Sequence, residues 1–430
     1  MFNRFKKAVV VLAALAILPA VANAQTSRIG GMAVPGDYVK DWSGIYTYVS
    51  EVGNVGNLVY GELGHVVSPG FTTPVDRGVG AVLGNLWDGR YGTWAIHMRE
   101  VSPALGQGIR FSNFSDASSN PGQFGFDPNF NGTEAFDVQW GRKFGTTSFG
   151  VRLNKSYGQF EGDLFTLGGG ATTNLEFDVD NAGDPNFFRN VFGLGAGVGF
   201  DMGPNSNLQV SGLWQSRTFE VSDSTGVTNY ENDGSTTYQL AARWMWQWQP
   251  NVLVVPVIKI YNFDLSTKGA LLTTETNTLS GWSAGLAGNW VLGSNDLFVL
   301  GATFASNKVE QESGIFDAGF GSGADPGTIQ ETIYPQVFAA LETHVNNWLT
   351  LRFGANKGVF RAVEVDDSAT PANYTVHNSP FSMALGAGVK VGNLQLDGVL
   401  NDNFAHNGLF FFSGVSQEAV ASRITATYAF

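Results

Sequence analysis

The stretch TYQLAARWMWQW, residues 237–248, alternates between a fully apolar face and a face that carries polar side chains. A two-residue period is that of a β-strand, because successive side chains point to opposite sides of the backbone. An aromatic-rich face backed by charged and amide groups is typical of a strand that separates lipid from water, so the stretch predicts a transmembrane β-barrel. The apolar face comprises Tyr238, Leu240, Ala242, Trp244, Trp246 and Trp248, and the polar positions are Gln239, Arg243 and Gln247.

The same pattern recurs from about residue 57 to the end of the chain, for example at 134–141, 148–154 and 381–390. Eight long connections and seven tight turns alternate between these segments, which predicts an all-β, antiparallel, closed barrel of sixteen strands at residues 57–430. Fourteen strands is the alternative if the first pair belongs to an N-terminal segment. Tight turns would lie in the periplasm and long loops outside the cell. The long connections are 67–78, 101–133, 157–188, 219–235, 265–279, 308–331, 361–378 and 403–419, and the tight turns 87–90, 144–146, 203–205, 249–251, 293–296, 346–347 and 392–393.

The composition favours the same fold. Charged residues are 14% of the chain, whereas soluble globular proteins carry about 25%. The formal net charge of −13 argues against nucleic acid as a partner. The chain has no cysteine, so disulfides are excluded. Beyond residue 24 no apolar stretch reaches the length of a spanning helix, so a membrane location requires a closed barrel in which strands pair all backbone polar groups.

The two ends of the sequence predict delivery to the outer membrane of a Gram-negative-type bacterium. Residues 1–24 combine a basic start, a short apolar run and the triplet Ala22-Asn23-Ala24, the pattern of a cleaved signal peptide. The last eight residues, 423–430, alternate and stop at Phe430, which resembles the signal read by the barrel-assembly machinery. We therefore expect outer-membrane lipid and that machinery as partners.

By alternation, a set of charged residues faces the lumen. The arginines among them would ring the lumen at a similar depth and could favour anionic solutes or pair with a plug. The other interpretation is that they pair with the lumenal carboxylates and only brace the wall. The candidates are Arg152, Arg217, Arg243, Arg352, Lys390 and Arg423, together with Asp137, Glu342 and Asp397.

Glycine occupies every second position of the segment 191–201, on the face opposite the apolar one. Glycine inside a strand indicates a close approach of another backbone or ligand, or a bend of the strand. The sequence leaves both interpretations open. The glycines are Gly193, Gly195, Gly197 and Gly199.

Two prolines fall inside otherwise regular strand patterns, Pro256 in 252–263 and Pro335 in 332–345. Each removes a donor from the hydrogen-bond ladder. They predict either a break in the wall that opens sideways to lipid, or an irregularity near the rim without a function.

The sequence contains no recognisable catalytic, metal-binding or phosphate-binding motif. The five histidines are scattered without metal-ligand spacing, and no nucleophile elbow or phosphate-binding loop occurs. The acidic loop at 178–184 has the oxygen spacing of a calcium loop but lacks the closing glutamate. We therefore expect no enzyme activity, no cofactor and no resident metal.

The run Arg28-Ile29-Gly30-Gly31-Met32, continuing through residues 36–41 to Ile45-Tyr46, resembles the N-terminal hatch region of the long-chain fatty acid transporter superfamily, which includes PorV-like proteins. The resemblance covers about twenty residues, and residues 46–50 depart from the family's Asn-Pro-Ala motif. It implies that residues 25–56 form a hatch that closes the lumen and that hydrophobic or small solutes are taken up past it. The hatch candidates are Arg28, Met32, Asp37, Asp41 and Tyr46.

Two other functions remain open at this stage. A general diffusion porin predicts a water-filled lumen that removal of residues 25–56 would hardly change. A structural or secretion-partner barrel predicts a stable protein complex. The substrate and the oligomeric state are not predicted.

Overall fold

The computed structural model describes residues 25–64, 78–84, 86–99, 134–160, 186–222, 228–232, 236–264, 266–269, 274–275, 277–293, 295–311, 327–367, 374–400 and 421–430. Three predicted features lie outside these residues: the signal peptide, the long loop 101–133 and the acidic loop 178–184.

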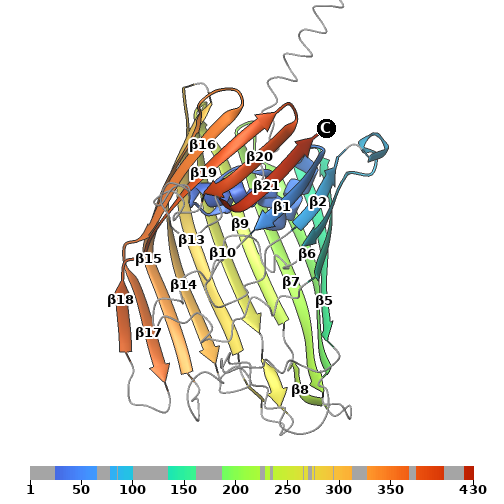
Figure 1. Ribbon diagram of the computed structural model, residues 1–430, viewed down its shortest axis with the longest axis vertical. Helices are drawn as coiled ribbons and strands as arrows, with labels where there is room; N and C mark the ends of the chain where they lie inside the picture. Colours follow the sequence, from blue (N-terminus) through green and yellow to red (C-terminus); the bar gives the residue numbers. More distant parts are fainter. Residues whose placement is uncertain are drawn as a thin grey trace, which may run out of the picture.

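The described strands form one closed antiparallel barrel (Figure 1). Each wall strand pairs with the next along the chain, and β1 pairs with β21 from Leu58↔Ala429 to Gly64↔Arg423, which closes the ring. β16 and β17 both pair with β15 and together make one wall strand, and β18 with β19 makes another. Counted in this way, sixteen wall strands surround the lumen, which confirms the predicted number and excludes fourteen.

The strand bounds are β1 (Leu58–Gly64), β2 (Gly78–Leu83), β3 (Thr93–Arg99), β4 (Glu134–Phe144), β5 (Thr147–Phe160), β6 (Asn186–Asp201), β7 (Ser206–Ser222), β8 (Thr228–Asn232), β9 (Thr236–Gln249), β10 (Val252–Asp264), β11 (Thr267–Gly269), β12 (Thr274–Glu275), β13 (Asn277–Leu292), β14 (Asp296–Gln311), β15 (Gly327–His344), β16 (Leu349–Gly358), β17 (Arg361–Asp367), β18 (Tyr374–Asn378), β19 (Phe381–Val391), β20 (Leu394–Leu400) and β21 (Ala421–Ala429). The short strands β8, β11 and β12 extend the sheet beyond the wall strands.

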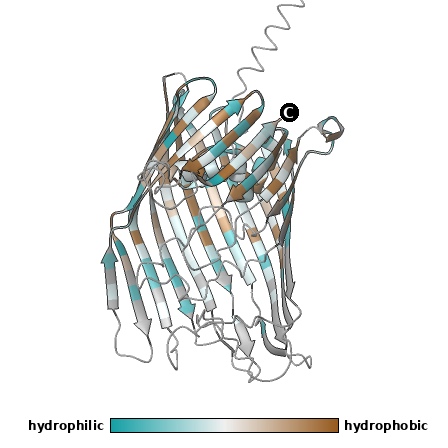
Figure 2. Cartoon of the chain, viewed as in Figure 1, coloured by the Kyte–Doolittle hydropathy of each residue, from teal (hydrophilic) through white to brown (hydrophobic). Residues whose placement is uncertain are grey.

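The outer surface of the barrel is apolar and the inner surface polar, as the alternation predicts. On β9, Leu240 is 55% exposed and Trp248 59%, whereas the intervening Gln239 and Arg243 are 3% and 1% exposed. Figure 2 shows hydrophobic and hydrophilic residues alternating along the strands. So much exposed apolar surface in a band around a monomer is compatible with lipid as the surrounding solvent.

The tight connections gather at the end of the barrel where the chain terminates, at the top of Figure 1. Several contain a glycine with positive φ, such as Gly145 at +60° and Gly392 at +61°, a conformation that other residues rarely adopt. At the other end, the strands run further than the sequence predicted. The segment 361–378 was expected to be a loop, but β17 and β18 occupy 361–367 and 374–378 because neighbouring strands pair with them.

Pro256 interrupts the ladder between β10 and β9 without shifting its register. The pairing of β10 with β9 skips Val255 and Pro256 and continues from Val257 in the same register. The missing proline donor therefore removes only local pairing.

Pro335 lies in a larger irregularity. The register between β14 and β15 shifts by one residue between Thr303 and Ala305, and at the same level β16 gives way to β17 and β18 to β19. The wall stays hydrogen-bonded there, because Tyr334 N donates to the Phe360 carbonyl at 2.9 Å and Val359 N to the Pro335 carbonyl at 2.8 Å. The sideways opening at these prolines stays a hypothesis.

The N-terminal segment, residues 25–56, lies inside the barrel at the tight-turn end, in blue in Figure 1. It contains α2 (Gln25–Met32) and three short 3₁₀ helices, η1 (Gly36–Tyr38), η2 (Trp42–Tyr46) and η3 (Val49–Asn54). Several glycines and Pro35 lie along the segment. Both residue types disfavour a helix interior, so the helices of the segment are short. None of the described helices is both long and apolar enough to cross a membrane.

Two clusters of buried apolar side chains lie between this segment and the wall. Met32 and Tyr38 pack with Phe338 and Val255, and Ile45 and Val52 belong to a second cluster around Trp42 and Tyr60. These two clusters form a packed core at the level of the segment.

Candidate functional site

The N-terminal segment touches opposite walls of the lumen. α2 contacts β15, β16 and β19 to β21, whereas η3 contacts β3 to β7 and η1 contacts β10. Residues 25–56 therefore cross the lumen from one side to the other. The candidate site consists of the polar groups of residues 25–56 and the lumen-facing side chains of the strands that they contact.

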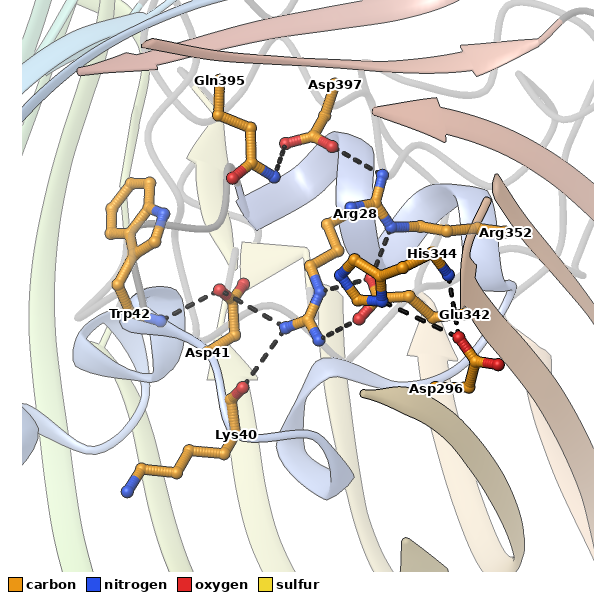
Figure 3. Close-up of polar contacts among 10 residues, drawn as sticks. All are labelled: Arg28, Lys40, Asp41, Trp42, Asp296, Glu342, His344, Arg352, Gln395 and Asp397. Carbon is orange, nitrogen blue, oxygen red and sulfur yellow. Dashed lines mark hydrogen bonds and ion pairs between the residues drawn. The ribbon is translucent and has the colours of Figure 1, made fainter. Parts of the chain in front are cut away.

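Arg28 on α2 is the centre of a buried charge network (Figure 3). Its guanidinium makes two parallel hydrogen bonds to Glu342 on β15, from Nε to Oε2 at 2.8 Å and from Nη2 to Oε1 at 2.7 Å. Arg352 on β16 joins Glu342 at 2.6 Å and Asp397 on β20 at 2.5 Å. Asp41 lies 3.9 Å from Arg28. Two-pronged arginine–carboxylate pairs are among the strongest polar contacts in proteins, so this network fixes α2 to the wall.

Burial and charge shift the pKa values of the segment's own groups. Burial lowers the pKa of Arg28, but the Glu342 carboxylate outweighs it and the net shift is upward. Burial raises the pKa of Asp41 to about 6, although Arg28 and the Ser43 hydroxyl act in the opposite direction. Asp41 also accepts hydrogen bonds from Trp42 N at 3.0 Å and from Ser43 Oγ at 2.8 Å, so it caps η2.

A second cluster joins η1 and η3 to β7, β9 and β10. Lys259 Nζ lies 2.5 Å from Asp37 Oδ2, and Arg243 Nη1 donates to the Asp37 carbonyl at 3.2 Å. Arg243 also stands over the Tyr48 ring at 4.0 Å and lies 3.8 Å from Glu51. The Arg243 guanidinium is thus enclosed by the segment on one side and by Gln209 of the wall on the other.

A third cluster lies where η2 meets β1 and β3 to β5. Arg152 Nη2 is 2.5 Å from Asp137 Oδ2, and its Nη1 donates to the Tyr46 carbonyl at 2.8 Å. The Tyr46 and Tyr60 hydroxyls are 2.6 Å apart, and the Tyr60 hydroxyl is 3.0 Å from His97 Nδ1. Arg152 therefore bonds both a wall carboxylate and the backbone of the segment.

Glycines of the wall let the backbone of the segment come close. A side-chain carbon at Gly150 on β5 would overlap the Val49 carbonyl, and one at Gly354 on β16 would overlap the Met32 carbonyl. At Gly197 it would lie 3.0 Å from Ser50 N. Gly193 and Gly195 face neighbouring wall side chains instead. The glycine row of β6 thus meets the segment only in the half nearer the tight turn.

The remaining lumen candidates lie apart from the segment. Lys390 is exposed at the tight-turn end of β19, and Arg423 pairs with Glu62 at 3.4 Å on the facing strand. Arg217 belongs to β7, but its side chain is outside the described set. Among the described residues no group of three or more His, Asp or Glu could hold a metal ion.

Sequence reasoning missed several partners. Lys259 faces inward by the alternation of β10, but the apolar residues around it hid this signal. Glu51 and Gln209 offered no motif, because their contact joins residues 158 apart in the sequence. On the described part of the chain, each buried lysine or arginine has a carboxylate within 4 Å: Arg28, Arg152, Arg243, Lys259, Arg352 and Arg361.

Comparisons with known proteins find distant similarity to solved structures. No protein-family model and no curated protein matches the sequence. A FadL homologue of Pseudomonas aeruginosa aligns with 10% identity and a TM-score of 0.40, covering 95% of this chain and 99% of that one. The toluene transporter TodX of Pseudomonas putida aligns with 11% identity and a TM-score of 0.37, covering 93% and 94%. CdiB from Escherichia coli has 9% identity and a TM-score of 0.41, and this chain spans 63% of its length.

Proposed function

We propose that this protein is an outer-membrane channel whose lumen is closed by residues 25–56 and which takes up hydrophobic or small solutes when that segment moves. The outward apolar band supports a place in a lipid bilayer. The hydrophobic class of solute rests on the resemblance of residues 28–46 to the hatch region of the long-chain fatty acid transporter superfamily.

One observation carries the proposal. The segment bonds to opposite walls, through Arg28 to Glu342 on β15 and through the Tyr46 carbonyl, which accepts a hydrogen bond from Arg152 on β5. A structural barrel has no need of such a crossing, and a general diffusion porin would be obstructed by it. No covalent bond is needed to hold the segment in place, and its ion pairs and hydrogen bonds to the wall can be broken and remade as it moves.

A reversible lock tests whether the segment must move. The chain has no cysteine, so a single disulfide can be introduced cleanly. Ser27 Oγ on α2 lies 2.7 Å from Thr425 Oγ1 on β21, and both residues are buried. The variant S27C/T425C should therefore form a disulfide between segment and wall.

We expect cells that carry the oxidised variant to take up radiolabelled toluene no faster than cells without the protein, and a reductant to restore uptake. The control is D201C/N207C, which joins two wall residues whose side chains are 2.7 Å apart near a tight turn. It should transport in both redox states. Uptake through the oxidised S27C/T425C barrel would disprove the proposal.

A further inference from the structure

Directly paired residues of neighbouring strands face the same side of the sheet, so the lumen wall is made of rows that run across the strands. One row consists of polar residues and glycine over six strands. It passes from His97↔Asp137 to Asp137↔Asn154, Asn154↔Gly193, Gly193↔Gln215 and Gln215↔Thr237. The next inward row toward the tight turns contains Gln139 on β4 and Gln239 on β9.

The first row lies on the loop side of the N-terminal segment, and the second borders the segment, because Gln139 pairs with Arg152. On β5 the segment overlies Gly150 and bonds Arg152, and Asn154 is the next inward residue toward the loops. On β7 the segment reaches Ser211, whose Oγ accepts a hydrogen bond from Val49 N at 3.4 Å, and Gln215 lies four residues further. A solute that enters from the loop side would meet this wall before the segment.

Five side chains of these rows are buried and hold polar atoms without a hydrogen-bond partner. Both polar atoms of the Gln139, Asn154 and Gln215 amides have none, nor do Thr237 Oγ1 and Gln239 Oε1. All five side chains are at most 3% exposed. Buried polar groups in native proteins are nearly always hydrogen-bonded, so a concentration of unused donors and acceptors in one patch indicates a place for a polar ligand or ordered water.

Gly193 brings two of the amides together. A side-chain carbon on Gly193 would collide with Asn154 Oδ1 and would lie 2.8 Å from Gln215 Cγ. The Asn154 and Gln215 side chains therefore both lie close to Gly193, one from each neighbouring strand. Asn154 and Gln215 thus form one patch of amides and not two separate polar residues.

The charges around these amides favour a neutral ligand group over an anionic one. The nearest buried cation, Arg152, is already paired with Asp137 and bonded to Tyr46. A carboxylate would find no free positive charge there and would lose its hydration. Amide and hydroxyl groups, by contrast, offer donors and acceptors to a neutral hydroxyl or amide group.

We infer that Gln139, Asn154, Gln215, Thr237 and Gln239 form a polar subsite that binds the neutral hydroxyl or amide group of a solute on the loop side of the segment. The inference rests on the proposed function and sharpens it. The preferred solute has an apolar body with one uncharged hydrogen-bonding head.

Three probes with the same aromatic ring test this assignment. Toluene has no polar group, benzyl alcohol has a neutral hydroxyl group and benzoate has an anionic carboxylate. Binding to the full-length protein in lipid nanodiscs is measured by saturation-transfer difference NMR, with empty nanodiscs subtracted. We expect benzyl alcohol to bind more tightly than benzoate. The variant N154A/Q215A should weaken benzyl alcohol roughly three- to tenfold while toluene changes little, as the loss of one or two hydrogen bonds predicts.

The matched control N205A/Q330A removes the same two amides from exposed positions outside the lumen and should change nothing. T237V keeps the side-chain shape, so it tests the hydroxyl alone if the double variant does not fold. Benzoate binding as tightly as benzyl alcohol would overturn the inference. So would unchanged benzyl alcohol binding in N154A/Q215A and T237V, since the patch would then hold only ordered water. Either result leaves the disulfide-lock test of the channel unaffected.

Discussion

The two ends of the N-terminal segment are held in different ways. The α2 end is fixed by charge, because Arg28 lies between Glu342 and Asp41 and Glu342 also bonds Arg352. The η3 end rests mainly on backbone contact with glycines, such as Val49 against Gly150 and Gly53 against Gly141. Glycines also receive α2, at Gly354 and Gly386, and η3 carries Glu51, 3.8 Å from Arg243, so what distinguishes the α2 end is the two-pronged Arg28–Glu342 pair.

This difference shows how the N-terminal segment can be held tightly in the lumen and still be able to leave it. Glycine contacts depend on shape, so neither pH nor salt changes them. The charge network depends on the protonation and pairing of a few groups. We therefore expect changes at the η3 end to act sterically and changes at the α2 end to act through unpaired buried charge.

The largest effect is expected from G150V. Added volume in a packed interior costs about 1–3 kcal/mol where side chains can yield, but here the new carbons would overlap the Val49 backbone carbonyl. We expect η3 to leave its place and the conductance of the barrel in planar bilayers to rise markedly. G61V is the control, since nothing lies within 4 Å of a side-chain carbon at Gly61. A closed G150V barrel would show that η3 does not depend on the glycine contact.

The next effect is expected from E342A. Removal of the Glu342 carboxylate leaves the buried Arg28 with the Lys40 carbonyl at 3.3 Å and the Asp41 carboxylate at 3.9 Å. Breaking a buried ion pair from one side costs about 3–5 kcal/mol. R28A should cost less, because Glu342 keeps Arg352 as a partner. Thermal unfolding in detergent measures both.

The exposed pair Lys308–Glu310 supplies the control for these variants, and K308A should cost about 0–1 kcal/mol. Because Arg28 and Glu342 act on each other, the double variant R28A/E342A should be less destabilised than the sum of the single variants. Additive losses would mean that the two residues do not work as a pair.

The smallest effect concerns pH. The pKa of Asp41 is about 6 in the folded chain and about 3.9 in an unfolded one, so folding binds a proton between these values. Stability should therefore fall as the pH rises from about 4 to about 6, by on the order of 1–3 kcal/mol. D41N cannot lose a proton, so its unfolding temperature should depend less on pH over this window. Equal slopes for D41N and the parent protein would assign the pH dependence to other groups.

Much of the wall could be predicted from the sequence, because the two-residue period and the turn residues are local properties. Residues 237–248 indicate which side of β9 faces lipid without any knowledge of its neighbours. The same locality explains where prediction failed. Residues 361–378 look like a loop taken alone, but β17 and β18 form because β15 and each other supply hydrogen-bond partners.

The partners in the lumen could not be predicted in this way. The sequence left open whether the inward arginines brace the wall or hold a plug, and the contacts show both: Arg152 bonds Asp137 on β4 and the Tyr46 carbonyl of the segment. The glycines of β6 were equally ambiguous, since Gly197 meets Ser50 N while Gly193 meets wall amides. The amides of Asn154 and Gln215 carried no motif.

By itself, the sequence determined a closed antiparallel barrel of sixteen strands and the facing direction of side chains along strands that alternate clearly, such as β9, since a strand with an apolar and a polar face has a strict two-residue period. Only the tertiary structure decided which inward groups meet. Arg28 and Glu342 are 314 residues apart, and their contact depends on the register of the whole ring and on the path of a segment too irregular in sequence to predict.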